Sequence, residues 1–138
     1  MTDPERPFAT VRWNGDLRFD AETPSGHHVL IDADSKQGPS PVLMLAAAAG
    51  ACAGSDVVSI LEKKRIRMAR CDVEIRGRRP DEYPRPFTEL TLRFHLAGEG
   101  LTETAARRSV ELSVEKYCSV LLSLNPAIPV RTEIVIEA

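Results

Sequence analysis

Two cysteines lie in segments that could position a thiol for chemistry. Cys52 follows a run of small and aliphatic residues, 42–51, that has the character of a buried helix. Cys118 lies 66 positions later, near the end of a second segment with helical spacing. Zinc knuckles use cysteines only a few residues apart, so this spacing does not indicate one. Two thiols on separate helices can instead form a redox couple that closes a disulfide.

The composition is that of one ordinary globular domain covering residues 1–138, with 43% hydrophobic and 28% charged residues. A formal net charge of -2 argues against a dedicated surface for nucleic acid or for an anionic membrane. Residues 1–6 have no apolar leader region, and the longest apolar run, 42–54, is shorter than the roughly 20 residues of a membrane span. We therefore expect a cytoplasmic protein with neither nucleic-acid nor membrane partners.

The remaining ligand-type residues predict neither a metal site nor a cofactor site. Three cysteines, an odd number, do not indicate a disulfide framework, and cytoplasmic thiols are normally reduced, which leaves metal binding or redox catalysis as the use of the thiols. His27, His28 and His95 are distant from the cysteines in sequence and show no ligand spacing. No phosphate-binding or dinucleotide-binding motif is present. Cys71 alternates with apolar residues as in a half-buried strand, so we expect it only to pack.

Hydrophobic periodicity and turn signals divide the chain into short strands and two helices. Asn14-Gly15 is a strong hairpin signal, and Ser40-Pro41 marks a helix start because Ser can cap and Pro is tolerated at the first helical position. The second helix follows spacings of three and four, which place Tyr117 in the core with its hydroxyl at an edge, and we expect an interruption near Cys118. The predicted strands are 9–13, 17–21, 27–32, 71–76, 88–96 and 129–136, and the predicted helices are 41–64 and 106–124. Alternation predicts an apolar face of strand 88–96 made of Leu90, Leu92, Phe94 and Leu96, with His95 on the other face, and inward-facing Val130, Ile134 and Ile136 in the last strand.

This order, β-β-β-α-β-β-α-β, predicts an α+β fold with antiparallel sheet covered by helices on one side. The first half of helix 41–64 is apolar around its whole circumference, which indicates burial on every side. A small sheet cannot cover that much helix. We therefore expect an obligate homodimer.

Several segments together resemble the OsmC/Ohr family of hydroperoxide-handling proteins. Gly38-Pro39-Ser40-Pro41 opens an alanine-rich helix that continues through Gly50-Ala51-Cys52 and Asp56-Val57-Val58-Ser59-Ile60-Leu61. The second signature surrounds Cys118 in segment 110–120, and the resemblance runs from about residue 9 to the C-terminus. Trp13 and the Ser25-Gly26-His27 turn are similar to the YhfA-like branch in particular.

The resemblance implies an intertwined homodimer in which each sheet has strands from both chains and the long helices lie between the sheets. It also implies thiol-dependent reduction of peroxides, organic ones especially, in defence against oxidative stress. By position, Cys52 would be the attacking thiol and Cys118 the resolving thiol. An external dithiol, of lipoyl type or a small thiol, would then reduce the disulfide.

Thiolate chemistry in an apolar helix needs a nearby cation, because burial disfavours the charged form of a thiol. The resemblance assigns this role to an arginine near the second strand, which is Arg18 here, with Arg12 as the alternative. Asp56 and Ser59, beyond Cys52 on the same helix, are expected to be polar cover only.

Two departures from the family pattern leave the function open. Relatives carry an acid before the helix cysteine, where this chain has Val42 and Leu43, and a proline often follows the second cysteine, where this chain has Ser119. The leading interpretation is a two-cysteine hydroperoxide reductase. The alternative is a non-enzymatic redox-sensing or small-molecule-binding dimer on the same scaffold, and a purely structural dimer with incidental thiols also remains open.

Overall fold

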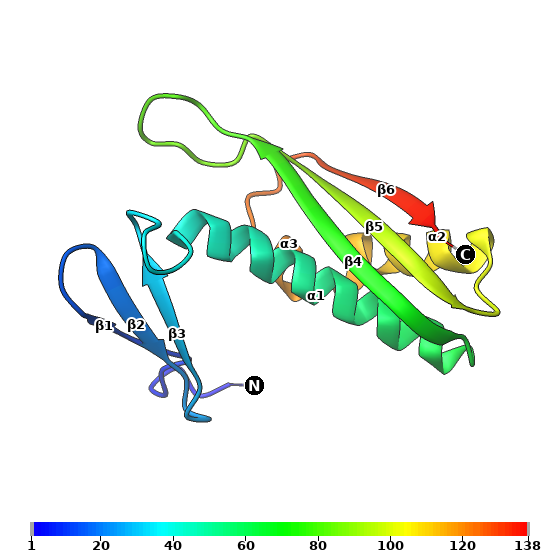
Figure 1. Cartoon of the computed structure of the whole chain (residues 1–138), viewed down its shortest axis with the longest axis horizontal. Coiled ribbons are helices and arrows are strands. Elements are labelled where there is room, and N and C mark those ends of the chain that lie inside the picture. Colours follow the sequence, from blue (N-terminus) through cyan, green and yellow to red (C-terminus); the bar gives the residue numbers. More distant parts are fainter. Residues whose placement is uncertain (1, 138) are drawn as a thin grey trace. The chain divides into compact units, whose positions relative to one another are not determined.

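A computed structural model of the protein describes residues 2–137 and divides the chain into two compact units, 1–45 and 46–138 (Figure 1). The elements are β1 (Thr10–Trp13), β2 (Arg18–Glu22), β3 (His28–Asp32), α1 (Pro41–Lys63), β4 (Arg67–Arg78), β5 (Glu89–Glu99), α2 (Glu103–Leu112), the π-helical turn η1 (Ser113–Tyr117), α3 (Ser119–Leu122) and β6 (Val130–Ile136). The α+β class and the predicted element order are confirmed.

The first unit holds an antiparallel meander in the order β1-β2-β3. The three strands begin and end within one residue of their predicted bounds. Gly15, in the turn between β1 and β2, has a φ of 83°, a conformation that favours glycine. After β3, the buried carboxylate of Asp32 accepts the backbone N–H groups of Asp34, Lys36 and Gln37 and so fixes the loop that leads to α1.

Helix α1 begins as the sequence predicted. The hydroxyl of Ser40 accepts the N–H of Leu43 at 3.2 Å, which caps the helix, and Lys63 ends it one residue before the predicted end. In the second unit its buried residues recur at intervals of three and four along one face: Ala49, Gly50, Ala53, Gly54, Val57 and Leu61. A Cβ at Gly50 would overlap the end of the Ile75 side chain, so the glycine permits close approach to β4.

The second sheet has the order β4-β5-β6 and corrects one prediction. Strands β4 and β5 are antiparallel, but β6 runs parallel to β5, so this sheet is mixed rather than antiparallel. The helical segment 103–122 between them provides the crossover that returns the chain to the start of a parallel strand.

One core joins the helices and the second sheet. Leu90, Leu92, Phe94 and Leu96 on β5 are at most 1% exposed, as their alternation predicted. They form one cluster with Val57 and Leu61 of α1 and with residues of α2. On β6, Val130 and Ile134 pack against this cluster, whereas Ile136, also predicted to face inward, is 41% exposed at the end of the strand.

Helix α1 is long and apolar enough, by length and composition alone, to cross a membrane. The core helix of a globular protein passes the same test. Ala53, Val57 and Leu61 of α1 belong to the core that includes β5, so α1 serves as a core helix in this fold.

Candidate functional site

Helix α1 presents a thiol and a carboxyl group on one face. Cys52 and Asp56 are four residues apart, and side chains at this spacing are neighbours on a helix surface. Both side chains are half-buried, whereas Ala53 and Val57 beside them are completely buried. The face therefore brings two polar groups to the margin of the core.

A change of helix type positions Cys118. After α2 the chain forms one π-helical turn, η1, in which the N–H of Cys118 donates to the carbonyl of Ser113 at 2.7 Å. Cys118 itself is extended, with φ -71° and ψ 101°, and its sulfur accepts the N–H of Leu121 at 3.5 Å to cap α3. The predicted interruption is thus a π-helical turn that ends in a completely buried thiol. Such turns are frequent at functional sites.

The fold brings the two cysteines together. The sulfur atoms of Cys52 and Cys118 and a carboxylate oxygen of Asp56 all lie within 4.8 Å of one another. The two cysteines, 66 positions apart in sequence, come together because α1 and the η1 region contribute to the same core. The three side chains carry two oxidisable groups and one group that can hold a proton.

Ser113 links Asp56 to the backbone of α1. Its buried hydroxyl lies 2.9 Å from Oδ2 of Asp56 and 3.2 Å from the carbonyl oxygen of Ala53. A hydroxyl has one proton, so Ser113 donates to one of these acceptors at a time. When Asp56 is ionised, Ser113 donates to it; when Asp56 is protonated, Asp56 can donate to Ser113, which then donates to Ala53. A hydrogen bond is kept in both protonation states.

Asp56 is therefore not the polar cover that the sequence suggested. It is half-buried, hydrogen-bonded to a buried serine and adjacent to both sulfurs. The signal that could have identified it is its position four residues after Cys52 on a helix. Ser59, which shared that prediction, is exposed.

The two thiols differ in their surroundings. Burial is the largest influence on Cys118 and, together with the proximity of Cys52, raises its pKa to about 11, against the opposing effect of the Leu121 and Val120 amides. Cys118 is therefore a neutral thiol near pH 7. Cys52 is half-buried and so more accessible than Cys118.

The raised pKa of Cys118 predicts an alkaline loss of stability. The ordinary thiol pKa is 9.0, so above about pH 9 the unfolded chain loses this proton before the folded chain does. The stabilising effect is complete below that pH and is lost as the pH rises towards 11. Chemical denaturation from pH 8 to 11 should show the free energy of unfolding falling more steeply in the wild type than in Cys118→Ala. Parallel curves for the two proteins would contradict this.

Comparisons with known proteins assign this chain to a family. A family model described as OsmC-like protein matches residues 33–133. Protein YhfA of Escherichia coli strain K12 is 45% identical over 121 residues, which cover 87% of this chain and 90% of YhfA. This chain belongs to the OsmC-like family.

Solved structures share the OsmC-like fold. A structural-genomics structure, 40% identical to this chain, superposes with a TM-score of 0.86 and covers 93% of this chain and 96% of its own. An organic hydroperoxide resistance protein OsmC from Legionella pneumophila, at 16% identity, has a TM-score of 0.64 over 91% of this chain and 95% of that one. At that identity the likeness concerns the fold alone.

Arg18, the arginine that the resemblance assigned, lies on β2 of this OsmC-like chain. Its guanidinium donates to Oδ2 of Asp16 at 2.9 Å and to the carbonyl of Asn14 at 3.1 Å. Arg12, the alternative, lies on β1 and pairs with Glu22 at 2.7 Å. Val42 and Leu43 occupy the first turn of α1 and bring no acid there.

Cys71 lies outside the thiol cluster of the OsmC-like chain. It is half-buried on β4, and its sulfur lies 4.0 Å from the carbonyl oxygen of Gly54. Burial, with a smaller contribution from Asp72, raises its pKa. Together with Gly50, Gly54, Val73 and other residues of α1 and β4, it lines an open groove between the helix and the strand.

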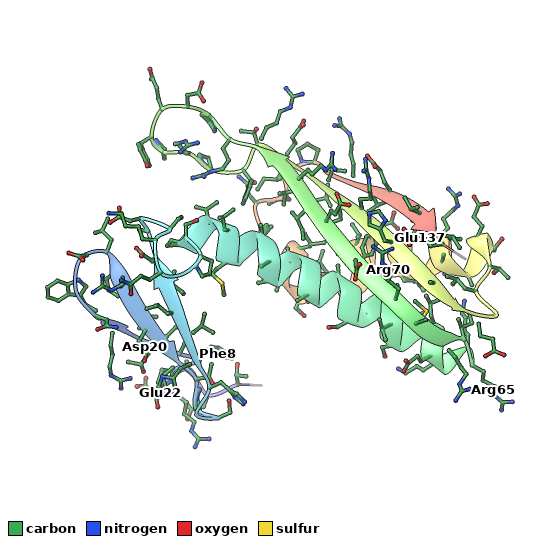
Figure 2. The ribbon with its side chains drawn as sticks, in the orientation of Figure 1. Phe8, Asp20, Glu22, Arg65, Arg70 and Glu137 are labelled. Carbon is green, nitrogen blue, oxygen red and sulfur yellow. The ribbon has the colours of Figure 1, made fainter. Side chains whose placement is uncertain are left out.

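His95 also lies away from the thiols, on the face of β5 opposite to Phe94 and Leu96. Its ring nitrogens lie 2.6 Å from Glu74 and 3.2 Å from Glu137. Arg70 pairs with Glu137 on the same sheet, and Figure 2 shows the two side chains beside each other. These polar contacts cover the face of the sheet opposite to the core, as the alternation of β5 predicted.

Proposed function

We propose that this protein is a two-cysteine, thiol-dependent hydroperoxide reductase that acts in the cytoplasm in defence against oxidative stress. The observation that carries the proposal is the cluster of Cys52, Cys118 and Asp56, whose reactive atoms lie within 4.8 Å of one another. Membership of the OsmC-like family, together with the resemblance of both cysteine-bearing segments to hydroperoxide-handling proteins, supports the substrate class.

In the first step, the thiolate of Cys52 attacks the terminal oxygen of a hydroperoxide. The O–O bond breaks, the alkoxide leaves with its electron pair, and Cys52 becomes a sulfenic acid. The half-buried position of Cys52 gives it access to the substrate, whereas the complete burial of Cys118 and its pKa of about 11 suit a thiol that reacts second. The two electrons come from the sulfur, so this step needs no cofactor.

Asp56 provides a place for the proton in this step. Its carboxylate can accept the thiol proton of Cys52 and return it to the leaving alkoxide, which departs as an alcohol. The hydrogen bond to Ser113 is available in both protonation states of Asp56, so the transfer leaves no buried hydroxyl without a partner.

In the second step, the thiol of Cys118 attacks the sulfenic sulfur of Cys52. Water leaves, and a Cys52–Cys118 disulfide forms before a second peroxide can over-oxidise Cys52. The sulfurs start within 4.8 Å, so side-chain rotation and a small movement of the η1 region bring them into bonding distance. An external dithiol then reduces the disulfide by exchange and leaves as its own disulfide.

Asp56→Asn should lower kcat/KM for an organic hydroperoxide by about a hundredfold, because the amide keeps the size of the side chain but cannot accept the thiol proton. Steady-state peroxide consumption with a dithiol reductant measures the change. The matched control is Ser59→Ala, an exposed position on the same helix, which should keep the wild-type rate. Equal rates for Asp56→Asn and the wild type would show that Asp56 does not transfer the proton.

Arg18 enters the proposal as the cation that stabilises the Cys52 thiolate and the developing charge. Arg18→Ala should then lower kcat/KM by about a hundredfold. Arg12→Ala is the matched control, because Arg12 lies on the neighbouring strand and pairs with Glu22. If Arg12→Ala has the lower kcat/KM of the two variants, Arg12 rather than Arg18 stabilises the Cys52 thiolate. If both variants keep the wild-type kcat/KM, neither arginine of this sheet stabilises the thiolate.

A second copy of the chain is part of the proposal. The start of α1 exposes Leu43 and Leu45, at 57% and 41%, in the single chain. Large apolar side chains on a helix of core composition are normally covered by another protein surface. An intertwined homodimer, as the family resemblance implies, would cover these side chains with the second chain. Sedimentation equilibrium would measure the mass of the assembly.

The experiment that tests the function is catalytic consumption of cumene hydroperoxide by the wild type in the presence of excess dithiol. We expect many turnovers per chain. The missing acid at Val42 and Leu43 favours the second candidate, a redox sensor that is oxidised once and turns over poorly. Consumption that stops at one equivalent per chain under excess reductant would favour the sensor and contradict the enzyme.

A further inference from the structure

The thiol cluster also has the donor atoms of a metal site. Two cysteine sulfurs and a carboxylate oxygen are a ligand set that suits thiophilic divalent cations such as Zn²⁺. Neighbouring ligands of a tetrahedral zinc site lie roughly 3.3–3.8 Å apart, given metal–ligand distances of about 2.0–2.3 Å. Because the three atoms here already lie within 4.8 Å of one another, each pair needs to close by about 1.5 Å at most.

Hydrogen bonds already orient two of the three ligands. Ser113 donates to Asp56 at 2.9 Å, and the N–H of Leu121 donates to the sulfur of Cys118 at 3.5 Å. Partners of this kind fix ligand geometry in metal sites and add to affinity. The third ligand, Cys52, lies on the same rigid helix as Asp56. No metal site was predicted from the sequence, because Cys118 lies far along the chain from Cys52 and Asp56 and no ligand spacing connects them.

We propose that the reduced chain binds one thiophilic divalent cation of the Zn²⁺ class through Cys52, Cys118 and Asp56, and that this binding excludes the disulfide. Three protein ligands leave a fourth position for water, as in open zinc sites. Both thiols bind as thiolates, so one cation displaces two protons.

Oxidation then releases the cation. Two thiolates give two electrons to one hydroperoxide; with two protons taken up, the products are the disulfide, an alcohol, water and the free cation. This release step rests on the proposed function, because it uses its oxidant. The binding step is independent of that function and can be measured alone.

Binding is tested by titrating fully reduced, metal-free protein with Zn²⁺ against a chromophoric chelator. We expect one Zn²⁺ per chain. Co²⁺ in place of Zn²⁺ should give thiolate-to-metal charge-transfer absorption and tetrahedral ligand-field bands. Cys71→Ser, the matched control for a thiol outside the cluster, should bind as the wild type does. Binding in less than one equivalent per chain, or as an adventitious ion only with no charge-transfer band, would overturn the proposal.

The variants assign the ligands. Cys52→Ser and Cys118→Ser should each weaken Zn²⁺ binding by more than about 100-fold. Mutation of a residue that only hydrogen-bonds to a metal ligand costs about 10–100-fold in affinity, and loss of a ligand itself should cost more. Asp56→Asn should weaken it at least about tenfold, while Ser59→Ala leaves it unchanged. Circular dichroism of each variant establishes that it is folded. Wild-type affinity in folded Cys52→Ser or Asp56→Asn would contradict the assignment of that ligand.

Two oxidants separate the failure of this proposal from the failure of the proposed function. Diamide oxidises thiols to disulfides without a peroxide, and one equivalent added to the Zn²⁺-loaded protein should release the cation. Zn²⁺ retained after the Cys52–Cys118 disulfide has formed would overturn the metal site. Release by diamide but not by cumene hydroperoxide would support the metal site and contradict the hydroperoxide reductase.

Discussion

A Cys52→Ser variant should lose catalytic consumption of organic hydroperoxide, with kcat/KM lower by at least about a thousandfold. The hydroxyl of serine is a far weaker nucleophile than a thiolate, and it cannot form a sulfenic acid. The sulfur–oxygen bond of the first step therefore cannot form. The substitution removes one sulfur atom from a half-buried position and should leave the fold intact. Stopped-flow measurement of peroxide loss under excess dithiol gives the rate.

The control for this variant is Cys71→Ser, which removes the half-buried thiol on β4 and should keep the wild-type rate. Peroxide consumption by Cys52→Ser at the wild-type rate would show that Cys52 is not the attacking thiol. If Cys71→Ser is the variant that loses activity, the reactive thiol lies on β4 rather than on α1.

The Cys118→Ser variant should keep the first reaction with peroxide and lose turnover. Cys52 can still attack, so we expect a burst of about one equivalent of peroxide per chain. Without the resolving thiol, the sulfenic acid persists, and excess peroxide converts it to the sulfinic acid, which a dithiol does not reduce. Steady-state consumption should fall by about a hundredfold or more, and the mass of the Cys52 peptide should rise by two oxygen atoms.

Sustained turnover in Cys118→Ser at the wild-type rate would show that the external dithiol attacks the sulfenic acid directly. Cys118 would then be a buried core residue rather than a resolving thiol. A variant without even the burst would indicate that Cys118 is needed to activate Cys52. Both outcomes contradict the separate roles that the different burial of the two cysteines supports.

Elements with strong local signals could be predicted from the sequence. The Ser40 cap, the alternation of β5 and the interruption of the second helix all depend on residues close together in the chain. Long-range order could not be predicted in the same way. The sequence gives no register between β5 and β6, so the parallel pairing was missed, and a helical crossover is compatible with either direction.

The π-helical turn explains another wrong prediction. Tyr117 fits the spacing of three and four that continues from Ala106 and Val110, and was expected in the core. In η1 each turn contains an additional residue, which rotates the side chains that follow. Tyr117 is 49% exposed as a result, and the next residue, Cys118, is completely buried. A local spacing rule cannot anticipate this change of phase.

The candidate site was predictable in part. The two cysteines stood out because of their residue type and sequence context, and the fold brings their sulfurs together. Asp56 was missed because an acid on an amphipathic helix is usually solvated, and only its contact with Ser113, 57 residues later in the chain, distinguishes it. The role of Arg18 still depends on the resemblance alone, and it stays a prediction.

The most direct test of the central claim is to map the disulfide that forms when the reduced wild-type protein meets one equivalent of cumene hydroperoxide. Alkylation of the remaining thiols, followed by peptide mass spectrometry, identifies the partners. We predict a Cys52–Cys118 disulfide within one chain and a free Cys71. A disulfide that includes Cys71, or a sulfinic acid at Cys52 beside a free Cys118, would contradict the account.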